Sequence, residues 1–138
     1  MSTLEELDEI VMIFKNVNCD FEIMHCNSSY PMSENEANLM CIQTLKKRYG
    51  CDVGYSGHES TLLKICITAV ALGATSIERH ITLDRAMYGS DQAASIEVSS
   101  LKSFVDTIRM IPLIKGDGVK KITDKEKIVR KKLRVEIK

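Results

Sequence analysis

Two histidines stand where predicted strands end. His58 follows the segment 51–55, and His80 lies within the segment 76–82. Neighbouring parallel strands lie only about 4.8 Å apart, so the two imidazoles could reach one divalent ion. Two neutral nitrogen ligands without a nearby cysteine leave coordination positions for water and substrate oxygens. That donor set suits Mn²⁺ or Mg²⁺ as a Lewis acid better than a closed structural zinc site.

The segment around His80 alternates in polarity. Glu78 and His80 share one face, while Ile77 and Ile81 share the other. If the isoleucines face covering helices, the acid and the imidazole face the catalytic side of the sheet. The alternative is a buried His–Glu pair that satisfies itself, because one histidine is weak evidence of a site. The nearby His58 favours the catalytic interpretation.

The third histidine and the loop after it are less specific. His25 alternates with Phe21 and Ile23, so it is predicted to face the helices in a structural role. The loop Asn27–Tyr30 is rich in groups that could donate hydrogen bonds to phosphate or sugar oxygens. The same pattern also occurs in ordinary turns.

The elements that must position these residues alternate along the chain. The sequence predicts strands at 20–26, 51–55 and 76–82 and helices at 3–15, 33–50, 59–72 and 99–112. Three strand–helix units after an initial helix indicate an α/β fold with a parallel sheet. Three parallel strands leave two open edges and cannot close a barrel, which takes eight. The chain is therefore expected to be a piece of something larger.

Composition narrows the class of protein. The chain has 138 residues, with 44% apolar and 28% charged, as in a globular domain with a core. We find no run of about 20 apolar residues and no basic leader, so we expect a cytoplasmic protein without a membrane span. The five cysteines are odd in number and form no C-x-x-C pair, which predicts reduced thiols rather than disulfides or a zinc ribbon.

Charge is unevenly distributed along the chain. The net charge is zero, yet residues 115–138 contain ten Lys or Arg and four Asp or Glu. Acids interrupt this basic segment and no aromatic residue is available for base stacking. We therefore expect a solvated linker helix and no nucleic-acid partner.

Five blocks, in the same order, resemble the sialic acid synthase family. They read HCNSSYP at 25–31, GYSGHE at 54–59, AVALGA at 69–74, ERHITLD at 78–84 and GSD at 89–91. The resemblance covers roughly residues 20–115. It implies a partial (β/α)8 TIM barrel, with residues 1–114 as the C-terminal half of the catalytic barrel. Residues 115–138 would then be a basic linker toward an antifreeze-like domain.

The resemblance also implies a reaction. The family condenses phosphoenolpyruvate with an N-acetylated amino sugar, typically N-acetylmannosamine, to give a nonulosonic acid and inorganic phosphate. His58 and His80 would bind the divalent metal, which polarises the sugar's open-chain aldehyde for attack by the enol carbon. Full-length members are expected to be homo-oligomers, as dimers, in which a partner's arginine reaches the sugar.

Further roles are implied residue by residue. Ser28 and Ser56 would bind phosphoenolpyruvate, and Tyr30 and Asp91 would contact the sugar. Glu78 would belong to the catalytic group together with the two histidines, either orienting a ligand or handling a proton.

Position 57 and the extent of the chain depart from the family pattern. Some relatives have Asp where this chain has Gly57, and we assign that position no role. The lysines that grip phosphoenolpyruvate belong to the first half of the family's barrel, which has no counterpart here. We accordingly expect a synthase fragment, or alternatively a non-catalytic metal- or phosphosugar-binding remnant or a subunit that needs a complementary half. The acceptor is N-acetylmannosamine or a related diacetamido-trideoxy sugar.

Overall fold

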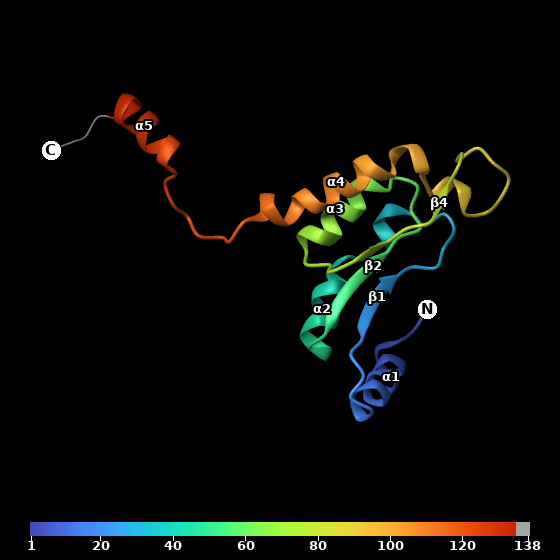
Figure 1. Ribbon diagram of the computed structural model, residues 1–138. Helices are drawn as coiled ribbons and strands as arrows, with labels where there is room; N and C mark the ends of the chain where they lie inside the picture. The colour runs from blue at the N-terminus through green and yellow to red at the C-terminus, as the bar shows by residue number, and fades with distance from the viewer. Residues whose placement is uncertain (135–138) are drawn as a thin grey trace.

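A parallel β-sheet forms the centre of the computed structural model, which describes residues 1–134. Strand β1 (Glu22–Cys26) pairs along its whole length with β2 (Asp52–Ser56), whose end pairs with β3 (Ile77–Glu78) (Figure 1). A second parallel pair joins β4 (Ile81–Thr82) to β5 (Ile96–Glu97). The α/β class and the parallel pairing are as predicted. Strand β5 was expected to be loop.

Helices pack on one face of this sheet, and the last helix of the chain lies away from it (Figure 1). Their bounds are α1 Leu4–Asn16, α2 Met40–Tyr49, α3 Leu63–Ala71, α4 Val98–Lys115 and α5 Asp124–Leu133, with short 3₁₀ helices η1 Glu34–Glu36 and η2 Gln92–Ala94. A capping box starts α1, because Thr3 and Glu6 exchange side-chain to backbone hydrogen bonds. Gly50 ends α2 in the left-handed conformation, as expected of a C-terminal glycine.

The core lies between the sheet and helices α2 and α3. Val53 and Tyr55 of β2 are both 0% exposed and pack with Ile42 of α2 and Cys66 of α3. Because side chains alternate along a strand, Ser56 points to the opposite face of the sheet. The buried face therefore fixes which β2 side chain is available for a site.

The predicted helix over 33–50 is interrupted. Ser33 does form a capping box with Glu36, but the turn that follows is only the 3₁₀ helix η1. Asn38 then takes a positive φ of 41°, which an α-helix does not allow. The α-helix proper begins at Met40.

Two other helix boundaries differ from the prediction. The helix expected from residue 59 begins at Leu63, because Glu59 is 0% exposed and Leu62 has a φ of 26°. Helix α4 does not end near Pro112 but continues to Lys115, with the amide of Gly116 donating to the Pro112 carbonyl.

The predicted strand 76–82 is split into β3 and β4. Pairing with β2 ends at Glu78, and the chain then crosses to β5, so that Ile81 lies opposite Ile96. The alternation of side chains between the two faces of the strand is broken at this crossing. Ile77 packs on the core as predicted, but Ile81 is 60% exposed and does not face the helices.

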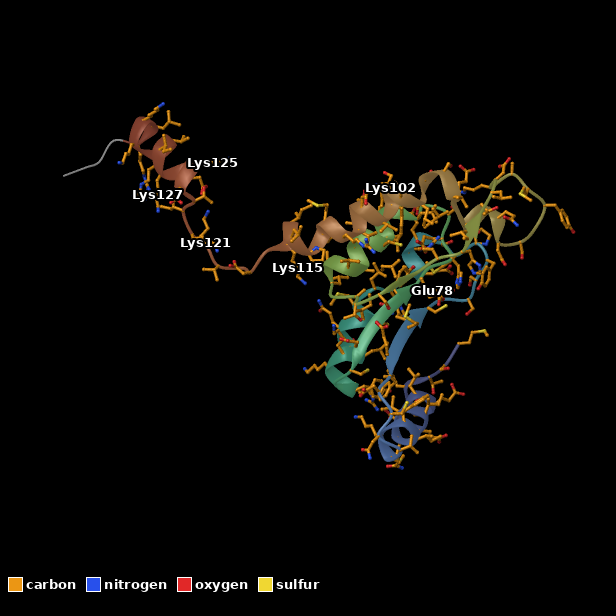
Figure 2. All side chains as sticks on the ribbon, viewed as in Figure 1. Glu78, Lys102, Lys115, Lys121, Lys125 and Lys127 are labelled. Carbon is orange, nitrogen blue, oxygen red and sulfur yellow. The ribbon has the colours of Figure 1, made fainter. Side chains whose placement is uncertain are left out.

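The basic C-terminal segment lies apart from the sheet. An extended stretch leads from α4 to α5 (Figure 1), and α5 contains no buried residue. The labelled Lys121, Lys125 and Lys127 lie away from Glu78 (Figure 2). Lys121 pairs with Asp117, and Lys127 with Asp124, at 3.0 and 2.8 Å. In the described part of the chain, none of the helices has the length and apolar character needed to cross a membrane.

All five cysteines are free thiols within residues 1–134. Cys66 is 0% exposed, and burial raises its pKa to about 12. We expect iodoacetamide at pH 8 to label the exposed Cys19 and to leave Cys66 unmodified, as peptide mass spectrometry would show. The raised pKa also means that the stabilisation from neutral Cys66 is complete below pH 9.0 and is lost as the pH rises toward about 12. Equal labelling of both thiols in the native chain would contradict this burial.

Candidate functional site

The carboxyl ends of the three central strands meet at one edge of the sheet. The register pairs Cys26 with Ser56 and Ser56 with Glu78, so the last residues of the strands form a row. The Ser56 hydroxyl donates a 2.8 Å hydrogen bond to Glu78 Oε1. In parallel sheets, ligands bind at this end of the strands.

His58 is held by the loop after β1. Its Nδ1 lies 2.7 Å from the Asn27 carbonyl oxygen, and its Nε2 lies 2.9 Å from the Tyr30 hydroxyl. A carbonyl can only accept, so Nδ1 carries the proton and Tyr30 donates to Nε2. A backbone contact of this kind fixes the tautomer of metal-binding histidines. Nε2 is consequently the nitrogen with a lone pair available for an ion.

The imidazole of His80 lies beside that of His58. Their ring centroids are 5.3 Å apart, and the ring of Tyr30 is 6.2 Å from that of His80. Within residues 1–134, no group of three or more His, Cys, Asp or Glu side chains is arranged to hold a metal. The donor set is therefore two nitrogens, which fits an ion that keeps water or substrate oxygens in its remaining positions. The Mn²⁺ or Mg²⁺ site stays a prediction.

Burial and nearby acidic groups raise the pKa of the Tyr30 hydroxyl, which contacts His58. Burial raises the pKa of Tyr30, and the charges of Cys26, Asp91 and Glu78 raise it further. Cys26 Sγ in turn lies 3.9 Å from the Ser28 hydroxyl. Of the residues that the sequence assigned to the site, the contacts at this edge of the sheet join Tyr30 to His58, His58 to His80 and Ser56 to Glu78. Ser28 lies in the loop after β1, and the charge of Asp91 acts on Tyr30. Their individual roles stay predictions.

His25 lies on the other face, as predicted. Its Nε2 donates to the Ala37 carbonyl oxygen at 2.8 Å, and its ring is 6.2 Å from that of the buried Tyr55. These contacts agree with a structural role. His25 is consequently a suitable control for experiments on the other two histidines.

Sequence reasoning missed an ion pair beneath the site. Glu59 follows His58 and Arg79 precedes His80, and their side chains are 0% and 2% exposed, with Arg79 Nη1 2.6 Å from Glu59 Oε1. Gly57 makes room for this pair, because a Cβ there would lie 2.1 Å from Arg79 Nη1 and 2.7 Å from Glu59 Oε2. Opposite charges directly beside the two histidines were the available signal.

Comparisons with known proteins agree with the resemblance. Residues 1–120 match the family model described as the NeuB family. An N,N'-diacetyllegionaminic acid synthase of Campylobacter jejuni is 41% identical over an alignment of 144 residues. The alignment covers 96% of this chain and 42% of the relative. An N-acetylneuraminate-9-phosphate synthase of Mus musculus is 37% identical, with 96% and 37% covered.

A solved structure shares the fold. The N-acetylneuraminic acid (sialic acid) synthetase of Leptospira borgpetersenii, crystallised with citrate, superposes with a TM-score of 0.82 at 38% identity. The superposition covers 99% of this chain and 48% of that one, so the chain spans about half or less of the relatives it matches. With residues 1–120 matched, the chain belongs to the NeuB family, whose sialic acid synthases its sequence resembles.

Proposed function

We propose that the chain supplies the metal site and part of both substrate sites of a sialic acid synthase. The reaction would join phosphoenolpyruvate to N-acetylmannosamine or a related N-acetylated amino sugar and release phosphate. The adjacency of His58 and His80, with ring centroids 5.3 Å apart at the ends of two strands, is the observation that carries this proposal. The synthase names of the relatives support the reaction class.

The fold would be an arc of a (β/α)8 barrel. Parallel strand–helix units and a TM-score of 0.82 with a synthetase about twice as long support this proposal. In such a barrel, active sites lie at the carboxyl ends of the strands, where Ser56 and Glu78 are found. Residues 1–114 would form the barrel half, and residues 115–138 a linker toward an antifreeze-like domain.

The two histidines would hold the ion through Nε2 of His58 and the imidazole of His80. When bound, Mn²⁺ or Mg²⁺ would supply Lewis acidity toward the aldehyde oxygen of the sugar. The Asn27 carbonyl keeps the proton of His58 on Nδ1. The Tyr30 hydroxyl now occupies the Nε2 lone pair, so it would turn away to contact the sugar.

The polar row at the strand ends would orient the substrates. Ser56 and Ser28 would hydrogen-bond phosphoenolpyruvate, and the Ser56 hydroxyl, which now donates to Glu78 at 2.8 Å, would turn from that carboxylate to do so. Glu78 would orient a ligand or carry a proton beside the metal. Asp91 would contact the sugar together with Tyr30, whose hydroxyl already experiences its charge.

We expect His58→Ala and His80→Ala each to weaken Mn²⁺ binding by at least about tenfold, because each removes a ligand. Isothermal titration calorimetry of the chain with MnCl₂ measures the affinity. His25→Ala is the matched control, because that side chain bonds to the Ala37 carbonyl oxygen on the other face. Equal affinities for wild type and both site variants would refute the metal site.

A further inference from the structure

Two charged side chains that the proposed reaction does not use are buried next to the two histidines. The Glu59 side chain is 0% exposed and the Arg79 side chain 2% exposed. In sequence, one directly follows His58 and the other directly precedes His80. Removing charges from water is costly unless they are paired and hydrogen-bonded, so the arrangement of this pair needs an explanation.

The guanidinium of Arg79 connects three segments of the chain. Nη1 lies 2.6 Å from Glu59 Oε1, while Nη2 donates to the carbonyl oxygens of Glu59 and Ala94 at 2.6 and 2.8 Å. The hydroxyl of Tyr55 donates to the other carboxylate oxygen at 2.9 Å. A planar guanidinium bonded at both terminal nitrogens has a fixed position. Glu59 is thereby held through its side chain and its backbone.

The contacts of Arg79 begin where backbone pairing between β2 and β3 ends. The last registered pair is Ser56 with Glu78, followed by a 3.3 Å bond from the Gly57 amide to the Glu78 carbonyl. Beyond this point the chain after β3 turns toward β5, and the carbonyl of His80 accepts from the Ile96 amide. The backbone ladder therefore ends one residue before His58 and two residues before His80, whereas the Arg79–Glu59 contacts join the residues adjacent to them.

We propose that Glu59 and Arg79 are positioning residues that set the spacing between the imidazoles of His58 and His80. The contacts of Arg79 with the Glu59 carboxylate, the Glu59 carbonyl and the Ala94 carbonyl are the means. The inference rests on the proposed function for its consequence in metal binding. The spacing itself does not depend on metal and can be measured without it.

The test removes both charges together, in the double variant Glu59→Leu, Arg79→Met. Replacing a whole buried pair by apolar side chains leaves no unpaired charge, and such replacements are often neutral or stabilising. The chain has only three histidines, so the nuclear Overhauser effect between the ring protons of His58 and His80 can be assigned in the metal-free chain. We expect this effect to disappear while the signals of His25 stay unchanged. Mn²⁺ affinity should fall about 10- to 100-fold, as for losses outside the ligands themselves.

Two further variants make the result specific. Asp8→Leu, Arg48→Met removes an exposed pair whose closest atoms are 2.5 Å apart, and it should keep both the Overhauser effect and the affinity. Arg79→Lys keeps the buried charge but has one nitrogen in place of the two that bond to the Glu59 carboxylate and to the carbonyls of Glu59 and Ala94. It should therefore weaken both the Overhauser effect and the Mn²⁺ affinity. It decides the question if the double variant does not fold.

The outcomes separate this inference from the proposed function. Wild-type Overhauser intensity in the folded double variant, or in Arg79→Lys when the double variant does not fold, would overturn the positioning role. A chain that loses the effect in these variants, yet binds no Mn²⁺ as wild type, would support the positioning role and refute the metal site.

Discussion

Incubated alone with phosphoenolpyruvate, N-acetylmannosamine and Mn²⁺, the 138-residue chain is expected to release no measurable phosphate. Orientation of the reactants lowers such barriers by about 7–11 kcal/mol. The resemblance assigns the grip on phosphoenolpyruvate to lysines of the first half of the barrel, and the chain spans 42% of a related synthase. A phosphate-release assay measures the outcome. Turnover of about 1 to 10³ s⁻¹ would contradict it.

Complementation is the matching control. The N-terminal part of a related synthase, produced separately, is expected to restore phosphate release when mixed with this chain. It should not do so with His58→Ala. A non-catalytic remnant, the competing hypothesis, would bind Mn²⁺ but would never support release with any complementary half.

Arg79→Met is expected to have the largest effect on stability. It leaves the carboxylate of Glu59 buried with the Tyr55 hydroxyl as its remaining side-chain donor. Breaking one side of a buried pair costs about 3–5 kcal/mol, against a total of about 5–15 kcal/mol for a domain. Denaturant unfolding followed by circular dichroism measures the loss in the free energy of unfolding.

Arg48→Met is the control for this loss. Arg48 also forms an ion pair, with Asp8 at 2.5 Å, but both side chains are 40% or more exposed and water screens the pair. We expect its unfolding midpoint to stay near that of wild type. A midpoint for Arg79→Met that equals the wild-type value would show that the buried pair does not stabilise the fold.

Local patterns predicted most of the scaffold and the adjacency of His58 and His80. Strands β1 and β2 and the end of α2 at Gly50 follow from short apolar runs and a C-terminal glycine. The adjacency of His58 and His80 followed from a general property of parallel sheets, whose carboxyl ends meet at one edge. That property needs no knowledge of the packing between elements.

Features that depend on distant contacts were not predictable in this way. The alternation over 76–82 gave no sign that pairing would pass from β2 to β5, which left Ile81 60% exposed. The positive φ of Asn38 and the burial of Glu59 likewise depend on residues elsewhere in the chain. From sequence alone, a charged residue is predicted to face solvent unless its buried partner is known.

Gly57 couples substitution in this loop to the buried ion pair of Glu59 and Arg79. A Cβ at position 57 would lie 2.1 Å from Arg79 Nη1 and 2.7 Å from Glu59 Oε2. A side chain at position 57 therefore requires the Arg79 guanidinium or the Glu59 carboxylate to shift. Substitution at position 57 is accordingly coupled to the ion pair of Glu59 and Arg79.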